Sequence, residues 1–413
     1  MRARTSRRTA LVTVGVAGGL FVLVAALMIP WRPVPGGPLE PPAPEELFTA
    51  AEIARAESYA AWARVWSWSS LALSLVVAGL FGFTRWGRRL MARLPGPWWA
   101  RMVLGVAFLV LVGRLLTLPL GLALRQHRLD NGLTSQSLGG YLSDVILSQV
   151  VTIVVTSLAL AVLIGGARRW RRHWPAVVGG LLGALVLVAS FAYPVVIEPL
   201  FNDFEPLAEG ELRSSILEVA ETEGVEVREV LVADASRRTT TLNAYVSGFA
   251  GTRRVVLYDN LVDDLPRDQA LSVVAHELAH ARHNDVLVGS VLGGLGAALA
   301  VGLLGLMIGS PRVRHLAPDE LRTAAAVPLV MALLAVGTLV SSPVQAGISR
   351  QVELRADRDA LEATGDADGF VEMQLQLARR SLSDPTPPAW SHFWFGSHPT
   401  TLQRVALAER LRH

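Results

Sequence analysis

The segment VVAHELAHARH, residues 273–283, carries two histidines and a glutamate in the spacing H-E-x-x-H. On a helix, residues four apart lie on one face about 6 Å apart along the axis, so His276 and His280 can bind one zinc ion at about 2.0–2.1 Å. Glu277 projects beside them and can reach an attacking water. The pattern predicts a zinc site for hydrolytic chemistry. The alternative is a pair of solvated histidines flanking an acid.

A catalytic zinc site needs a third protein ligand and an open position. His283 lies about 10.5 Å along the helix from His276, too far for one ion to bind both, and we expect it at the surface or beside the ligands. Glu353 and Asp357, in SRQVELRADRDAL (349–361), share a helix face. We predict Glu353 as the third ligand and Asp357 as the acceptor of a ligand histidine's outer N–H. Taken alone, this segment also suits a solvated helix whose arginines pair with acids.

The composition indicates a membrane protein. Only 18 % of the 413 residues are charged, against about a quarter in soluble domains. The net charge of +3 says little about nucleic acid, and we expect no nucleic-acid partner. The chain has no cysteine, so any transition-metal site must use histidines and carboxylates.

Seven stretches have about the 20 mostly apolar residues that a membrane span needs. They are 10–30, 62–84, 98–124, 143–167, 175–198, 286–309 and 323–348. The first also suits a signal peptide, but no small-x-small cleavage site follows it, so we count it as a span. These spans predict a mainly α, polytopic membrane protein of about seven transmembrane helices.

A small α+β insertion interrupts the spans. It is expected to hold a helix at 207–223 and strands at 228–234 and 253–260, with 239–248 as the candidate for a third strand. We divide the chain into five N-terminal transmembrane helices with short Arg-rich loops, the insertion ending in the H-E-x-x-H helix, helices six and seven, and a C-terminal helical piece carrying Glu353. The bounds are 1–198, 199–285, 286–348 and 349–413.

Arginine placement predicts the orientation. Fourteen arginines lie in segments on one side (Arg2, Arg4, Arg7, Arg8, Arg85, Arg88, Arg89, Arg93, Arg168, Arg169, Arg171, Arg172, Arg312, Arg314) and four on the other (Arg32, Arg55, Arg125, Arg128). The N-terminus is therefore expected in the cytoplasm, and the insertion and C-terminal piece outside it. Two spans separate His280 from Glu353, so both return to one membrane face. Both ligand helices are expected to extend membrane spans.

Five ordered motifs now identify a resemblance. They are YPVVIEPLFNDFEPLAEGELRSSI, LNAYVSGFAGTRRVVLYDNLV, VVAHELAHARHND, SRQVELRADRDAL and SHPTTLQRVALAER. In this order they resemble the integral-membrane zinc metalloproteases of the type I CAAX prenyl protease family, with the HtpX-like proteases as relatives. The resemblance implies a gluzincin-type zinc protease domain, with His276, His280 and Glu353 as zinc ligands, Glu277 as the base and Asp357 supporting the ligands.

The resemblance also suggests how substrate is held. Asn243 and Ala244 look like the strand against which substrate aligns by backbone addition. His398 and Arg404 occupy the family's late His-Pro…Arg positions, where they can stabilise an oxyanion or hold substrate. The alternative is a capping histidine and a surface arginine. Asp285 resembles the HtpX-like version of the motif and is given no role.

Family members enclose a chamber among their helices, and Arg114, within an apolar span, is expected to face a wet interior or a carboxylate. A snorkelling Arg114 near a shifted span boundary is the alternative. All 38 basic residues are arginine. This composition looks bacterial, so we expect a bacterial cell membrane and do not expect prenylated protein substrates.

The predicted function is a membrane-embedded zinc metalloendopeptidase acting on membrane-associated proteins or peptides. The main alternative is a non-catalytic, zinc-stabilised membrane scaffold or chaperone of the same fold. A transporter predicts matching halves with broken helices, which are not found. A site-2-type protease predicts its H-E-x-x-H within a hydrophobic span, whereas the residues before His276 are amphipathic.

Overall fold

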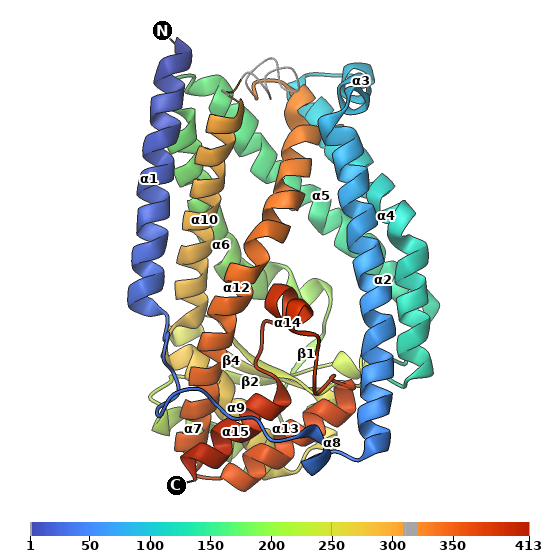
Figure 1. Cartoon of the computed structure of the whole chain (residues 1–413), viewed down its shortest axis with the longest axis vertical. Helices are drawn as coiled ribbons and strands as arrows, with labels where there is room; N and C mark the ends of the chain where they lie inside the picture. The colour runs from blue at the N-terminus through green and yellow to red at the C-terminus, as the bar shows by residue number, and fades with distance from the viewer. Residues whose placement is uncertain (1, 249, 309, 311–320, 413) are drawn as a thin grey trace.

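The computed structural model describes residues 2–248, 250–308, 310 and 321–412. Within these ranges, seven helices are long and apolar enough to cross a membrane, which confirms the polytopic, mainly α class. They are α1 (Arg2–Met28), α2 (Ala50–Phe83), α4 (Trp98–Asp130), α5 (Leu138–Arg169), α6 (Trp174–Val196), α10 (Asp285–Ile308) and α12 (Val327–Thr364). They run along the long axis of the molecule (Figure 1). The amphipathic α3 (Arg85–Arg93) lies at the same end as the N-terminus.

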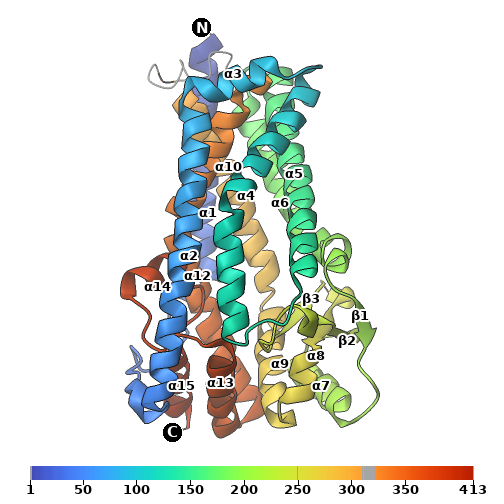
Figure 2. The ribbon, with the colours of Figure 1, turned by 90° about the vertical axis from the view of Figure 1, so that its right-hand side faces the viewer.

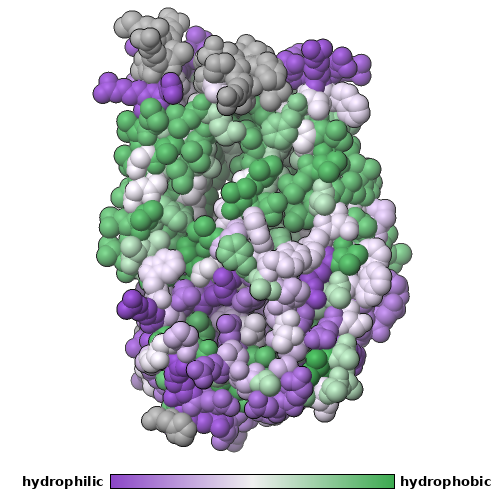
Figure 3. All heavy atoms as spheres, viewed as in Figure 1, coloured by the Kyte–Doolittle hydropathy of each residue, from purple (hydrophilic) through white to green (hydrophobic). Residues whose placement is uncertain are grey.

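The hydropathy of the molecular surface agrees with helices that cross a membrane. A broad hydrophobic band covers the upper and middle part of the face in Figure 3, and hydrophilic side chains gather at both ends. Such a band is what a membrane-embedded helical bundle presents to lipid. The chain is therefore an integral membrane protein. Arg312 and Arg314, which entered the orientation argument, lie outside the described residues.

The two helices that carry the predicted ligands are connected to their membrane spans in different ways. α12 is one continuous 38-residue helix, so Glu353 stands on a direct extension of the seventh span, as predicted. The H-E-x-x-H helix α9 (Arg267–Arg282) instead ends before α10 begins. Between them Asn284 takes a left-handed backbone with φ of 53°, a conformation that interrupts a helix. The expectation that α9 extends the sixth span was wrong.

A sheet of four strands lies at the other end of the described molecule, in the order β1-β2-β4-β3. The strands are β1 (Phe204–Pro206), β2 (Glu229–Ala233), β3 (Ala244–Ser247) and β4 (Arg254–Tyr258). The central pair β2 and β4 is parallel, and the outer pairs are antiparallel. The predicted strands at 228–234 and 253–260 are confirmed. The third is shorter than 239–248, and β1 was not predicted because three residues carry little pattern.

The insertion and the C-terminal piece share one hydrophobic core. The remaining helices are α7 (Glu211–Thr222), α8 (Asp259–Asp264), α13 (Ala367–Ser381), α14 (Ala389–Phe395) and α15 (Thr401–Leu411). Leu257 of β4 and Leu278 of α9 are buried together with Phe370 of α13 and Leu407 of α15. Burying four such side chains stabilises the fold by about 1.5–3 kcal/mol each, and it locks α9 against both C-terminal helices.

α6 and α10 approach closely because glycines face each other. A Cβ built on Gly294 would lie 2.9 Å from the Gly183 carbonyl oxygen, and one on Gly183 would lie 3.0 Å from the Gly294 oxygen. Small residues at a helix interface allow such close approach in membranes. By contrast, nothing lies within 4 Å of a Cβ on Gly296.

We therefore expect Gly294→Val to destabilise the protein by about 1–3 kcal/mol, because the added side chain overpacks the α6–α10 interface. Gly296→Val, in the same helix, is the matched control and should be close to neutral. Thermal unfolding of the detergent-solubilised variants measures the difference. Equal midpoints for the two variants would contradict this account of the interface.

Candidate metal centre

Three side chains from α9 and α12 converge on one point. The Nε2 atoms of His276 and His280 lie 3.2 Å apart. Glu353 places Oε2 3.3 Å from His276 Nε2 and Oε1 3.6 Å from His280 Nε2. One ligand atom from each lies within 4.8 Å of the others. Two ligands at about 2.0–2.1 Å in a tetrahedral shell stand about 3.3 Å apart, so this donor set fits zinc.

Each candidate ligand histidine has a carboxylate on its outer nitrogen. Asp357 Oδ1 lies 2.9 Å from His276 Nδ1, and Asp285 Oδ2 lies 2.9 Å from His280 Nδ1. Such pairs hold a proton on Nδ1, leave Nε2 free to bind a metal, and fix the ring orientation. Asp357 was assigned this position from its spacing to Glu353. No role was assigned to Asp285 from the sequence, and its approach to His280 follows from the turn at Asn284.

Arg404 binds the two buried carboxylates of α12. Its Nη2 donates to Glu353 Oε2 and its Nη1 to Asp357 Oδ1, both at 3.0 Å. The Arg404 side chain is only 10 % exposed. A capping box between Thr400 and Gln403 starts α15 and so sets where Arg404 emerges. Because both terminal nitrogens are engaged, the geometry favours a positioning role for Arg404 over a direct oxyanion contact.

His398 faces the open side of the site. Its side chain is 60 % exposed, and its Nε2 lies 3.5 Å from Glu353 Oε2. On the other ring nitrogen, Nδ1 lies 2.9 Å from the Ser397 hydroxyl oxygen. His398 can therefore reach a bound substrate, whereas Arg404 is held behind the ligands.

The electrostatics favour a cation between the ligands. Burial lowers the pKa of His276, but the nearby carboxylates of Asp357 and Glu353 outweigh burial and raise it to about 10. The same groups that attract a proton attract a metal ion. Burial also raises the pKa of Glu277, which makes its carboxylate a stronger proton acceptor than an exposed glutamate.

A cleft of about 240 Å³ brings several predicted residues together. Its lining includes Asn243, His276, Glu277, His398 and Arg404. Ala244 does not line this cleft. It is buried in β3 and pairs with Leu257 of β4. β3 is an edge strand of the described sheet, so no described strand pairs with its outer side.

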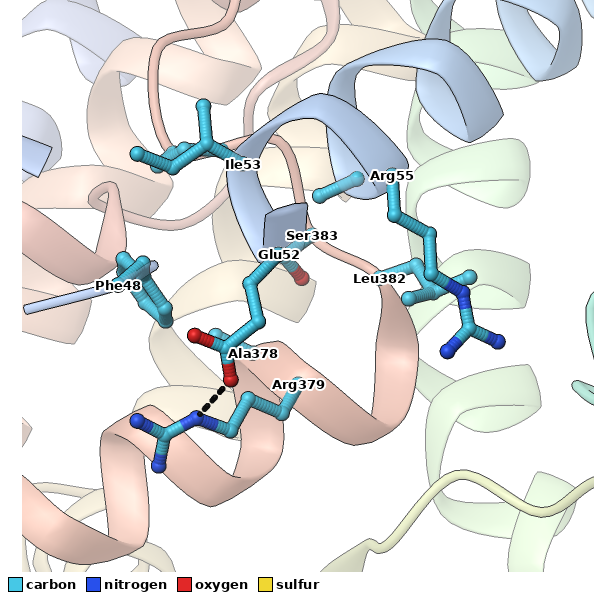
Figure 4. A pocket seen from close by; sticks show the side chains of 10 residues that line it. Phe48, Glu52, Ile53, Arg55, Ala378, Arg379, Leu382 and Ser383 are labelled. Atoms are coloured by element: carbon cyan, nitrogen blue, oxygen red, sulfur yellow. Dashed lines mark hydrogen bonds and ion pairs between the residues drawn. The ribbon is translucent and has the colours of Figure 1, made fainter. Parts of the chain in front are cut away.

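Two other features stand apart from the centre. His283 lies 2.6 Å from Asp359 and is not in the described metal-binding group. A cavity of about 130 Å³ lies between α2 and α13, where Glu52 and Arg379 form an ion pair of 2.9 Å (Figure 4). None of the candidate metal ligands lines it, although Ala378 and Ser383 line both this cavity and the cleft. Its ion pair ties α2 to α13.

The seven-helix bundle and the His-His-Glu group together define a membrane metalloprotease, and the comparisons agree. The family model described as Peptidase family M48 matches residues 206–412, and the one described as CAAX prenyl protease N-terminal, five membrane helices, matches residues 40–203. The chain belongs to peptidase family M48. The resemblance drawn from the five sequence motifs is thereby confirmed.

Curated relatives and a solved structure support this membership. The chain is 30% identical over 315 residues to the uncharacterized metalloprotease YhfN of Bacillus subtilis, covering 74% of this chain and 72% of that one. It is 28% identical to the CAAX prenyl protease 1 homolog of Oryza sativa subsp. japonica, covering 68% and 66%. The crystal structure of S. mikatae Ste24p has the same fold, with a TM-score of 0.78 at 20% identity over 97% of this chain and 99% of that one.

We expect Asp285→Asn to weaken metal affinity by about 10–100-fold, because the amide no longer holds the His280 ring in its metal-binding tautomer. Asp268→Asn, an exposed change at the start of α9, is the matched control. Chelator competition with the purified protein measures the affinity. Equal affinity in the two variants would remove Asp285 from the metal centre.

Proposed function

We propose that this membrane metalloprotease is a zinc-dependent endopeptidase of the gluzincin type, with His276, His280 and Glu353 as its protein ligands. The convergence of their donor atoms carries the proposal, since it joins two helices that lie far apart in the sequence. The carboxylates on both outer histidine nitrogens support it further. No observation favours the non-catalytic alternative, in which Glu277 would have no reason to line the cleft.

Glu277 is the proposed general base and acid. Zinc, when bound, supplies a Lewis acid that polarises the scissile carbonyl and lowers the pKa of the attacking water toward about 7. Glu277 takes a proton from that water and later delivers it to the leaving amine. Its pKa, raised by burial, suits the first half of this cycle, because a more basic carboxylate accepts a proton more readily.

His398 is the proposed donor to the oxyanion, and Arg404 holds the ligands in place. A single oxyanion contact is typically worth about 2.7–4 kcal/mol. The exposure of His398 on the cleft side supports this division. Both terminal nitrogens of Arg404 donate hydrogen bonds to Glu353 and Asp357. Its proposed role is therefore to keep Glu353, the third ligand, oriented.

The proposed substrates are membrane-associated proteins or peptides. The edge strand β3 offers backbone groups for an extended peptide, and Asn243 at its start lines the cleft. Glu353 stands on a direct extension of a membrane helix, so the site lies close to the bilayer. A substrate tethered to lipid reaches such a site without leaving the membrane.

Glu277→Gln is expected to retain zinc and lower peptide cleavage by about 10²–10⁴-fold, because the amide cannot accept the proton. The exposed Glu221→Gln in α7 is the control and should cleave normally. Zinc content by elemental analysis and turnover of a peptide mixture by mass spectrometry give the two readouts. Wild-type turnover in the Glu277 variant would end this assignment.

We further propose that the N-terminus faces the cytoplasm of a bacterial cell and the metal centre faces outward. The chain has no cysteine, so single cysteines report accessibility directly. A membrane-impermeant maleimide on intact cells should label Thr222→Cys in α7 and spare Ala92→Cys in α3. Lysed cells, where both should react, are the control. The reverse labelling pattern would invert the topology.

A further inference from the structure

The short helix α14 presents an exposed aromatic surface. Its seven residues, AWSHFWF, include no acidic side chain and no arginine, and none of them is buried. Trp390 is 53 % exposed, Phe393 54 % and Phe395 43 %. Trp390 and Phe393 are three residues apart, so they share one face of the helix. Exposed apolar patches of this kind mark a surface that contacts another molecule or a membrane.

α14 lies near the level at which the spans leave the hydrophobic band. In Figure 1 it sits between α2 and α12, level with the end of α1 at Met28, and Figure 2 shows it on the outside of the bundle. Arg350 of α12, which contacts α14, lies about 35 Å along that helix from Val327. Because the hydrocarbon core of a bilayer is about 30 Å thick, α14 is placed at its edge.

Tryptophans of neighbouring elements lie near this level. Trp68 of α2 packs on α14, with its ring centroid 4.2 Å from that of Trp390 and 6.2 Å from that of Phe395. Trp62 of the same helix is exposed, and the exposed Trp31 follows the end of α1. Tryptophan is enriched at membrane–water interfaces because it combines an apolar ring with a polar N–H. This group of side chains is therefore typical of an interfacial aromatic belt.

Hydrogen bonds connect α14 to the cleft at the metal centre. Arg350 Nη1 donates to the carbonyl oxygen of His392 at 3.2 Å and to that of Gly396 at 2.5 Å. His392 Nε2 lies 3.0 Å from the His398 carbonyl oxygen. Gly396 keeps this turn compact, because a Cβ there would collide with the His392 ring. The position of α14 therefore determines where His398 stands in the cleft.

We propose that α14 is an interfacial helix that inserts Trp390 and Phe393 into the bilayer, and that this contact positions His398 at the cleft. The partner is the boundary between the phospholipid headgroups and the acyl chains. The second half of this inference rests on the proposed function, since it concerns the proposed oxyanion donor. Trp390 and Phe393 act through the turn at Gly396, so they are positioning residues.

A lipid partner fits this surface better than a soluble protein. Figure 3 shows that the hydrophobic band gives way to hydrophilic side chains around the level of α14, so the aromatic surface continues the band. A stable protein interface buries about 800 Å² on each partner, whereas α14 is a single helix of seven residues. Short elements that carry Trp and Phe on one side are suited to the membrane interface.

Single cysteines test the lipid contact, because the chain has no cysteine of its own. Phe393→Cys is labelled with bimane in the full-length protein, in nanodiscs of phosphatidylcholine and phosphatidylglycerol, and quenched by phospholipids with a doxyl group near the top of the acyl chain. Leu27→Cys, exposed at the end of α1, is the lipid-facing reference, and Thr222→Cys, exposed in α7, is the aqueous one. We expect quenching at position 393 close to that at 27 and about threefold or more above that at 222.

A charge at the same position tests the link to His398. Phe393→Glu should lower kcat for a peptide in the nanodiscs by about fivefold or more with little change in KM, because the carboxylate leaves the apolar phase and α14 moves with it. Phe393→Leu, which stays apolar, should restore most of kcat. Leu217→Glu, the same charge at an exposed leucine of α7, is the matched control and should be as active as the wild type.

A double-mutant cycle separates positioning from a general structural role. In a His398→Ala background Phe393→Glu should change kcat by less than about twofold, because the group that α14 positions is gone. Zinc content by elemental analysis should equal that of the wild type. If the glutamate variant loses zinc, Phe393→Ser takes its place with the same expectations.

Quenching at position 393 no stronger than at 222 would overturn the lipid contact. A wild-type kcat in the Phe393 variants, or a loss that persists in full without His398, would overturn the positioning of His398. If the wild type cut no peptide faster than Glu277→Gln does, the proposed function and the positioning role would fail together. The quenching result would still decide whether α14 enters the bilayer.

Discussion

A network of buried ion pairs joins α9, α12 and α15 and holds the candidate metal centre. Glu353 and Asp357 are buried on α12, where unpaired carboxylates would be costly. Arg404 pairs with both, and His276 lies against both. Each group is thus satisfied only when three separate helices are in place. The network makes the geometry of the site depend on the complete fold of this end of the molecule.

The hydrophobic core beneath the site supplies the rigidity that this network needs. α9 packs between the sheet and the C-terminal helices, with Leu278 and Leu407 buried in the same cluster. The metal-facing side of α9 therefore cannot move without disturbing that packing. Next to it, β3 is an edge strand of the described sheet, and Asn243 before it lines the same cleft as His276. A rigid ligand set thus stands beside an open strand, which suits a site that must hold an extended peptide.

The membrane helices contribute more than an anchor. α12 carries Glu353 and Asp357 beyond its apolar part without a break. α4 carries three arginines, Arg114 among them, to a cavity of about 600 Å³ between α2, α4 and α5, so Arg114 faces the interior, as expected for a charge within a span. Ser381 lines both this cavity and the cleft at the metal centre.

Local spacing in the sequence determined the helix periodicity, the number of spans and the group His276, Glu277 and His280, because each is set within a few helical turns. Spacing also pointed to Glu353 and Asp357, since the topology of two spans returns them to the same face. Only the tertiary structure decided the role of Asp285, which reaches His280 through the turn at Asn284. It also showed both terminal nitrogens of Arg404 engaged and gathered the α4 arginines around one cavity. These features depend on contacts between elements distant in the chain, which no local pattern records.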